Sequence, residues 1–346
     1  MHNPEFKKIC SLILFLAAFL GSSIVARTDG GYRLTKEIRL PGNSSWDLVT
    51  ADAVSRRLYV THGTLVQVVD LDSGTLVGTI PDLDGVHDVA IAPDLNRGYI
   101  TNGNRSTLTC FALDTLKKIA EIPTGKSPDA DVYDPATHQI FAFNETDHTA
   151  TVVDASTNVV VATMPLAAPE AAVVDGQGKL YLNLPDDNQI AEIDTQRLTV
   201  LHRWKTAPGT SPTGLAIDTK NHLLFVGCRS KRLVILSAFD GRYVADFPIG
   251  DHVDSTAFDP KTSLVFNSNG DGTLNIVREA SISEFTALET VTTKPGARTL
   301  ALDLKTGAVY LPVAGLKIDP QAAKLPGHHR PQVIPETFEL LQFTKN

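Results

Sequence analysis

The stretch RRLYVTHGTLVQVVDLDSGTLVGTI (residues 56–80) contains three short apolar runs and two turn signals within 25 residues. LYVT, LVQVVDL and LVGTI read as strands, and Asp72-Ser73-Gly74 is a typical turn sequence. A strand every eight or so residues, with almost no helical periodicity, is typical of an antiparallel meander. The fold therefore depends on whether this stretch occurs once or is repeated along the chain.

The pattern occurs seven times. Each copy begins with a strand ending near an Asp, and the copies align as SWDLVTAD (45–52), VHDVAIAP (86–93), PDADVYDP (128–135), PEAAVVDG (169–176), PTGLAIDT (212–219), VDSTAFDP (253–260) and ARTLALDL (297–304). Successive copies start 41, 42, 41, 43, 41 and 44 residues apart. A repeat of 40–45 residues with four strands per unit is the signature of propeller blades. The sequence predicts an all-β, seven-bladed β-propeller with four-stranded antiparallel blades.

The chain ends predict how the ring closes. The seventh unit supplies strands at 298–303, 308–313 and 337–343 but no outer strand. An unassigned alternating strand, YRLTKEIRL (32–40), precedes the first unit. We expect this N-terminal strand to pair with the C-terminal one and complete the last blade, because an incomplete blade would expose unpaired edges. Residues 27–346 would then form a single domain.

The first 26 residues resemble a secretory signal peptide. Lys7-Lys8 precedes the apolar run ILFLAAFL (13–20), and small residues follow it. This arrangement predicts cleavage near Ala26 and a periplasmic or secreted protein with no stable membrane span. The alternative is an uncleaved anchor, for which roughly 17 apolar residues are at the lower limit.

Charge and cysteine content restrict the possible partners. Removing residues 1–26 takes away two lysines and one glutamate, which changes the net charge from −8 to −9. An acidic chain argues against nucleic acid as a partner, since phosphate binding needs a basic surface.

Cys110 and Cys228 lie three blades apart, beyond the Cα separation of about 7 Å that a disulfide allows, so both should be free thiols. A closed ring leaves no edge that must pair, and we expect a monomer.

The repeats resemble the YVTN-type propellers of exported bacterial proteins, the YncE-like family. The resemblance rests on the second-strand motifs LYVTHG and GYITNG and on the Asp-Pro turns, and it extends from about Tyr32 to Lys345. It implies an exported propeller. Related seven-bladed propellers include lactonases, haem and quinone enzymes and binding modules, so the fold does not assign a chemistry.

Polar side chains gather where the inner strands begin. In a propeller, these strand starts and the connections between second and third strands lie at the mouth of the central channel. The blade-seven insertion (315–336) is long enough to cover that mouth. The predicted ligand-binding residues at this face are Trp46, His87, Asp88, Asp129, Glu170, Asp254, Arg298, His328 and His329.

These residues allow more than one interpretation. Polar inner-strand starts line a wet channel in any propeller, and Arg298 with Asp254 is most simply an ion pair. The other interpretation is that Asp129, Glu170 and Asp254, with His87 or the loop histidines, bind a cation or a hydroxyl-rich small molecule. Carboxylates with imidazole suit a divalent metal such as calcium, zinc or manganese, for which the three carboxylates are the predicted ligands. In calcium-dependent lactonase-type propellers, which are related to this family, Glu, Asp and Asn from different inner strands hold the metal, and Glu170 and Asp254 could fill such roles here.

Several catalytic sites are excluded by their missing motifs. The sequence contains no CxxCH for covalent haem c, no GxSxG elbow and no HExxH. We therefore favour an exported binding or scaffold module, whose ligand is a small molecule or another exported protein, over an enzyme. The alternative function is a metal-dependent hydrolase of the lactonase type.

Overall fold

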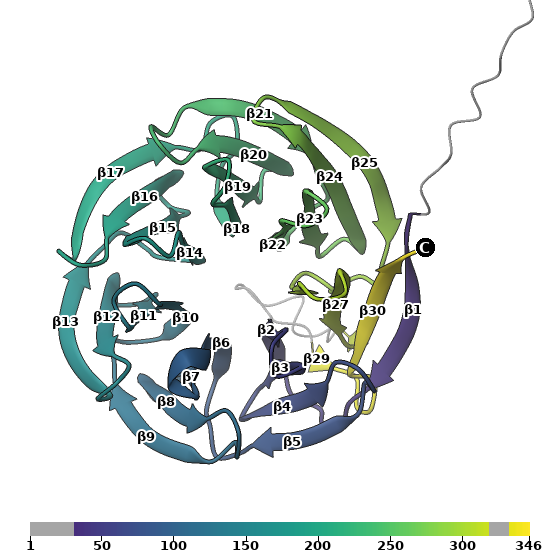
Figure 1. Ribbon diagram of the computed structural model, residues 1–346. Coiled ribbons are helices and arrows are strands. Elements are labelled where there is room, and N and C mark those ends of the chain that lie inside the picture. The colour runs from purple at the N-terminus through teal and green to yellow at the C-terminus, as the bar shows by residue number, and fades with distance from the viewer. Residues whose placement is uncertain (1–30, 318–331) are drawn as a thin grey trace, which may run out of the picture.

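The computed structural model describes residues 31–317 and 332–346. Seven four-stranded antiparallel sheets are arranged radially, with the first strand of each repeat innermost (Figure 1). The predicted fold class is confirmed. In the described ranges the only helical element is the 3₁₀ turn η1 (Pro93–Leu95), and no helix there is long and apolar enough to cross a membrane.

The first six blades each use four consecutive strands, which run in chain order from the axis outward. Blade one contains β2 (Trp46–Asp52), β3 (Arg57–His62), β4 (Leu65–Asp70) and β5 (Leu76–Ile80). Blade two contains β6 (Val86–Ala92), β7 (Arg97–Asn102), β8 (Thr107–Ala112) and β9 (Lys118–Pro123). Blade three contains β10 (Pro128–Asp134), β11 (Gln139–Asn144), β12 (Thr149–Asp154) and β13 (Val159–Pro165).

The next three blades follow the same order. Blade four contains β14 (Ala172–Val174), β15 (Lys179–Leu184), β16 (Gln189–Asp194) and β17 (Thr199–Lys205). Blade five contains β18 (Pro212–Asp218), β19 (Leu223–Cys228), β20 (Arg232–Ser237) and β21 (Tyr243–Pro248). Blade six contains β22 (Val253–Asp259), β23 (Leu264–Asn269), β24 (Thr273–Ser281) and β25 (Glu284–Thr292).

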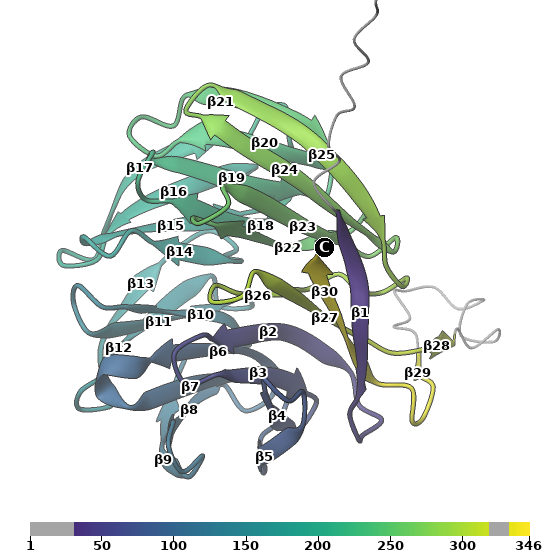
Figure 2. The ribbon, with the colours of Figure 1, turned by 45° about the vertical axis from the view of Figure 1, so that its right-hand side comes forward.

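Blade seven joins the two ends of the chain. Its order from the axis is β26 (Ala301–Asp303), β27 (Ala308–Val313), β30 (Glu339–Lys345) and β1 (Tyr32–Arg39). β1 pairs antiparallel with β30 from Tyr32 opposite Lys345 to Arg39 opposite Glu339, and both views show the two strands side by side (Figures 1 and 2). The predicted closure of the last blade is confirmed.

Aspartates explain the recurring turn after the inner strand. In six blades a carboxylate at the strand end accepts the backbone N–H two residues later, which fixes the tight turn into the second strand. These residues are Asp52, Asp134, Asp175, Asp218, Asp259 and Asp303. Blade two has Ala92 at this position and makes the connection through η1 instead.

The core is divided among the seven blade interfaces. One cluster of buried apolar side chains lies between each pair of neighbouring blades, so every sheet buries both faces. Between blades one and two, for example, the rings of Tyr59 and Phe111 lie 5.6 Å apart. The predicted free thiols are confirmed for Cys110 and Cys228, which are both buried in these interfaces.

Parts of the predicted insertion form a short ribbon. β28 (Leu316–Lys317) pairs with β29 (Gln332–Val333), apart from the seven sheets (Figure 2). His328 and His329, predicted at the ligand face, lie outside the described residues, and so does the predicted signal peptide (1–26).

Candidate functional site

The strand register corrects the sequence alignment of blade one. Trp46 pairs with His62 as Val86 pairs with Asn102 and Pro128 with Asn144. Asp47, and not Trp46, is therefore the blade-one equivalent of His87. The alignment was one residue out of register because it superimposed Trp46-Asp47 on His87-Asp88, and a one-residue slip exchanges the two faces of a strand.

Trp46 consequently belongs to the packing of the ring closure. Its ring lies 5.6 Å from that of Phe338, which also contacts the ring of His62 at 4.2 Å. Both Trp46 and Phe338 are part of the apolar cluster between blades seven and one. The structure places the predicted ligand-binding residue Trp46 in this cluster, apart from the polar residues that begin the inner strands.

Seven equivalent residues, one from each blade, lie at the start of the inner strand or just before it. We call them the rim: Asp47, His87, Asp129, Glu170, Thr213, Asp254 and Arg298. Most rim residues contact one another across blade boundaries. Contacts run without a break from Asp129 through His87, Asp47 and Arg298 to Asp254. The rim is therefore a connected polar network on five of the seven blades.

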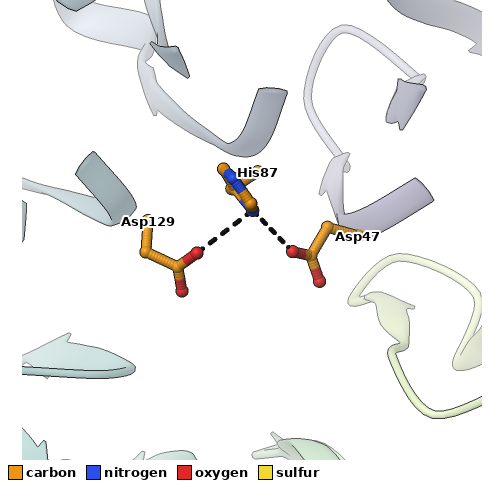
Figure 3. A group of neighbouring side chains, drawn as sticks. All are labelled: Asp47, His87 and Asp129. Atoms are coloured by element: carbon orange, nitrogen blue, oxygen red, sulfur yellow. Dashed lines mark hydrogen bonds and ion pairs between the residues drawn. The ribbon is translucent and has the colours of Figure 1, made fainter. Parts of the chain in front are cut away.

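His87 lies between two carboxylates (Figure 3). Its Nδ1 is 2.7 Å from Oδ2 of Asp47 and 3.1 Å from Oδ1 of Asp129. Burial disfavours the charged form of Asp47, but the hydrogen bond with His87 and the charge of Arg298 outweigh it and hold its pKa below the ordinary value. Burial and the charge of Asp47 raise the pKa of Asp129 to about 6.

Arg298 neutralises the other side of the rim. Its Nε donates to Oδ2 of Asp254 at 2.5 Å, and its Nη2 donates to Oδ1 of Asp47 at 3.1 Å. Arg229, from the loop after β19, donates to Oδ1 of Asp254 at 3.1 Å. The Arg298–Asp254 ion pair expected from the sequence is present, and Asp254 is shared by two guanidinium groups.

Glu170 differs from the other rim carboxylates. In the described part of the chain its side chain has no hydrogen-bond or ion-pair partner, whereas its backbone N–H donates to the carbonyl of Asn183. Burial raises the pKa of Glu170 well above its ordinary value, and the charges of Asp129 and Asp254 add to this effect. Its neighbour in the rim, Thr213, donates to the carbonyl of Val253. Among the described residues, Glu170 is thus the rim carboxylate without a hydrogen-bond or ion-pair partner.

Two further carboxylates lie next to the rim, between blades two and three. Asp88 accepts the backbone N–H groups of Val89 at 2.8 Å and of Asp131 at 3.3 Å, and burial raises its pKa to about 7. Asp131 is 8% exposed, and neither of its carboxylate oxygens makes a hydrogen bond. Burial and the nearby Asp88 raise the pKa of Asp131 well above its ordinary value.

Sequence reasoning missed Asp131, although the repeats contain a signal for it. The strand register aligns Asp131 with residues of five other blades that are apolar or uncharged: Val49, Val89, Ala172, Leu215 and Thr256. A charge at a position where the other blades carry no charge marks a local departure from the core pattern. Comparison of the blades position by position would have identified it.

The predicted metal ligands are only partly brought together. Within the described residues, one group of potential ligands has its donor atoms within 4.8 Å of one another, and it consists of Asp47, His87 and Asp129. Of the predicted set, Asp129 belongs to this group. Glu170 and Asp254 do not, and Asp254 is engaged by arginines.

Comparison with solved structures agrees with the fold. One match is a chain of a mitotic checkpoint complex, with TM-score 0.72 and 15% identity over 87% of this chain and 95% of the other. A second is U3-55K, with TM-score 0.72 and 12% identity over 90% of this chain and 98% of the other. A third is the WD40 repeats of RRP9, with TM-score 0.73 and 12% identity over 90% of this chain and 97% of the other. At such identities the likeness extends to the fold alone.

No protein-family model and no curated protein sequence matches the chain. The residues of the rim are therefore the basis for the proposed function.

Proposed function

We propose that this chain is an exported binding module whose rim takes a small ligand that carries positive charge. One observation carries the proposal. Glu170 is a half-buried carboxylate without a partner in the described structure, and it lies in a rim with three other carboxylates. The ionised form of such a carboxyl group is costly to bury without a paired cation, and a bound cationic ligand would supply that partner.

The rim also restricts the chemistry of the ligand. Asp254 is paired with Arg298 and Arg229, and Asp47 is paired with Arg298 and His87, so the side of the rim without an arginine partner among the described residues is the side of Glu170 and Asp129. A primary ammonium or a guanidinium group would make charge-assisted hydrogen bonds there. A lysine or arginine on an exported partner protein presents the same group. A basic peptide is therefore tested as a ligand together with a small amine.

Export and family membership are part of the proposal. Residues 1–26 have the pattern of a signal peptide, and the motifs Tyr59-Val60-Thr61 and Tyr99-Ile100-Thr101 support a YVTN-type propeller. N-terminal sequencing of the protein recovered outside the cytoplasm tests export, with Arg27 expected as the first residue. Recovery of an intact N-terminus would contradict cleavage.

A second candidate function is a metal-dependent hydrolase of the lactonase type. The observation in its favour is the grouping of Asp47, His87 and Asp129. This grouping differs from the ligand set that the lactonase resemblance implies, and Asp254 is bound by two arginines. Lactone and ester hydrolysis measured with and without chelator tests this candidate. Hydrolysis that depends on the metal would replace the binding function.

The binding function is tested by calorimetric titration with a primary amine, a guanidinium compound, a lysine-rich peptide and, for comparison, a neutral polyol. We expect the three cationic ligands to bind. Glu170→Gln should lower their affinity at least about tenfold, because the variant removes a partly desolvated charge–charge contact. Glu121→Gln, on the outer strand of blade two, is the matched control and should bind like the parent. Equal binding of cations and polyol, or an unchanged Glu170→Gln, would overturn the proposal.

A further inference from the structure

We propose that Asp47, His87 and Asp129 form a binding site for one divalent first-row metal ion, such as Mn²⁺ or Zn²⁺. The three residues begin the inner strands of three consecutive blades (Figure 3). The site shares Asp129 with the proposed cation-binding side of the rim but does not include Glu170. It is thus an inference additional to the binding of a cationic ligand.

The distances between the donor atoms carry the inference. The imidazole Nδ1 is 2.7 Å from one carboxylate oxygen and 3.1 Å from the other, and all three atoms lie within 4.8 Å of one another. Adjacent ligands of an octahedral ion with bonds of about 2.1 Å are separated by about 3 Å. The three atoms therefore have the spacing of ligands on one side of such an ion, without movement of the strands.

The orientation of the imidazole ring is set by the loop after β7. A Cβ atom at Gly103 would lie 2.9 Å from Nε2 of His87, so the ring packs directly on this glycine. Gly103 is itself held by a backbone hydrogen bond to the carbonyl of Gly85 at 2.7 Å. The contact leaves Nδ1 facing the two carboxylates. Fixing the ring in this way is the usual role of groups around a metal-binding histidine.

Each oxygen of Asp47 has a separate partner. Oδ1 accepts from Arg298 and Oδ2 faces His87. An ion bound at Oδ2 would leave the contact with Arg298 in place, so the guanidinium would hold the liganding carboxylate in its orientation. The carboxylate of Asp129 has no hydrogen-bond or ion-pair partner but His87 in the described residues, and it is available to an ion.

Two buried carboxyl groups lie close to the proposed ligands in the sequence. Asp88 directly follows His87, and Asp131 follows Asp129 by two residues. Both oxygens of Asp131 are buried without a hydrogen bond, and its side chain is more than nine-tenths buried. The ionised form of such a group is costly to bury alone, and a divalent ion at the site would supply a counter-charge.

The donor set indicates the class of ion. Two carboxylates and one imidazole suit Mn²⁺, Fe²⁺ or Zn²⁺, whereas Ca²⁺ prefers oxygen ligands alone and longer bonds. Three protein donors leave positions for water or a ligand, as in open metal sites.

Titration of the chelator-treated protein with Mn²⁺, followed by electron paramagnetic resonance at constant pH, tests the site. We expect one ion per chain and a ¹⁴N coupling from the imidazole. His87→Gln should abolish the coupling, and both His87→Gln and Asp129→Asn should weaken binding at least about tenfold. Glu284→Gln, an exposed carboxylate on the outer strand of blade six, is the control and should bind like the parent. Thermal unfolding of each variant verifies that it is folded.

Gly103→Ala is a second variant that keeps all three ligands. It should weaken Mn²⁺ binding by displacing the ring of His87, and parent-like affinity would contradict the role assigned to Gly103. Absence of Mn²⁺ and Zn²⁺ binding, or binding without ¹⁴N coupling, would overturn the metal site. Amine binding that persists in metal-free protein would then leave the proposed binding function intact, so the two failures are distinguishable.

Discussion

The hydroxyl of Tyr32 donates a hydrogen bond to the carbonyl oxygen of Gly307, 3.0 Å away and 275 positions later in the chain. The same tyrosine packs edge-on against Phe266 of blade six, with ring centroids 5.1 Å apart. The first described strand is thus anchored both to blade seven, which it completes, and to the neighbouring blade. Closure of the ring depends on side chains as well as on backbone pairing.

Deletion of residues 32–40 should strongly reduce the yield of soluble, monodisperse protein. The deletion removes buried Tyr32, Ile38 and Leu40 from two blade interfaces and leaves β30 as an unpaired edge. Size-exclusion chromatography and thermal unfolding measure the effect. Tyr32→Phe is the mild control, and loss of its hydrogen bond should cost only about 1 kcal/mol. A truncated chain that melts like the parent would show that β1 is dispensable.

Trp46→Ala should destabilise the fold without changing ligand or metal binding. The variant removes a half-buried ring from its contact with Phe338, and we expect a loss of about 2 kcal/mol in the free energy of unfolding. Denaturant unfolding gives the stability, and the titrations of the rim give the affinity. If folded Trp46→Ala lost affinity for the ligand or the metal, Trp46 would belong to the ligand site.

Asp131→Val should stabilise the protein at neutral pH. The valine reproduces the residue of blades one and two at this position, and it removes a buried carboxyl group that makes no hydrogen bond. We expect a gain of roughly 1–3 kcal/mol in the free energy of unfolding.

The matched control for Asp131→Val is Asp134→Val in the same strand. Asp134 accepts hydrogen bonds from the N–H of Ala136 and from the hydroxyl of Thr137. Its replacement should therefore be destabilising. Urea unfolding of both variants measures the difference. Equal losses in the free energy of unfolding would show that the carboxyl group of Asp131 is hydrogen-bonded in solution.

Glu279→Gln should change how stability depends on pH. The side chain of Glu279, on β24, is 4% exposed, and burial raises its pKa to about 7, although a hydrogen bond from Asn221 opposes this. In the unfolded chain a glutamate titrates near 4.3, so the folded state binds this proton more tightly. The free energy of unfolding should fall as the pH rises through this interval, by at most about 1.4 kcal/mol per pH unit.

The glutamine variant lacks this titration but retains an oxygen for Asn221. Its stability relative to the parent should therefore increase between about pH 4 and pH 7 and stay constant above that range. Urea unfolding at pH 5, 6, 7 and 8 gives the comparison. A constant difference between the two proteins at all four values would contradict the raised pKa of Glu279.

The repeat made most of the fold predictable from sequence. Alternation of apolar residues marks strands, and Asp at the end of each inner strand marks the turn that follows, because both effects act within a few residues. The period of about 42 residues then set the blade number. Closure by residues 32–40 followed from counting strands, since a blade with three strands would have left an edge open.

The candidate site was less predictable. His87, Asp129, Glu170, Asp254 and Arg298 were assigned to one rim because equivalent positions in a radial repeat lie at equal depth. The alignment placed Trp46 in the rim, where the structure has Asp47. Two neighbouring residues in a strand give nearly the same alignment but point to opposite faces. The local irregularity between Trp46 and Val49 in the pairing with β3 cannot be read from the residues alone.

The strands, the turns, the seven blades and their closure follow from the residues alone, since each of these depends on local propensity or on the need to bury both faces of a sheet. Which charges meet across the blades depends instead on how the sheets pack against one another. Asp47 and His87 are 40 positions apart, and Asp47 and Arg298 are 251 apart, yet each pair is in contact. Such contacts depend on the angle between sheets and on the register of each strand to one residue, and neither is encoded in a local pattern.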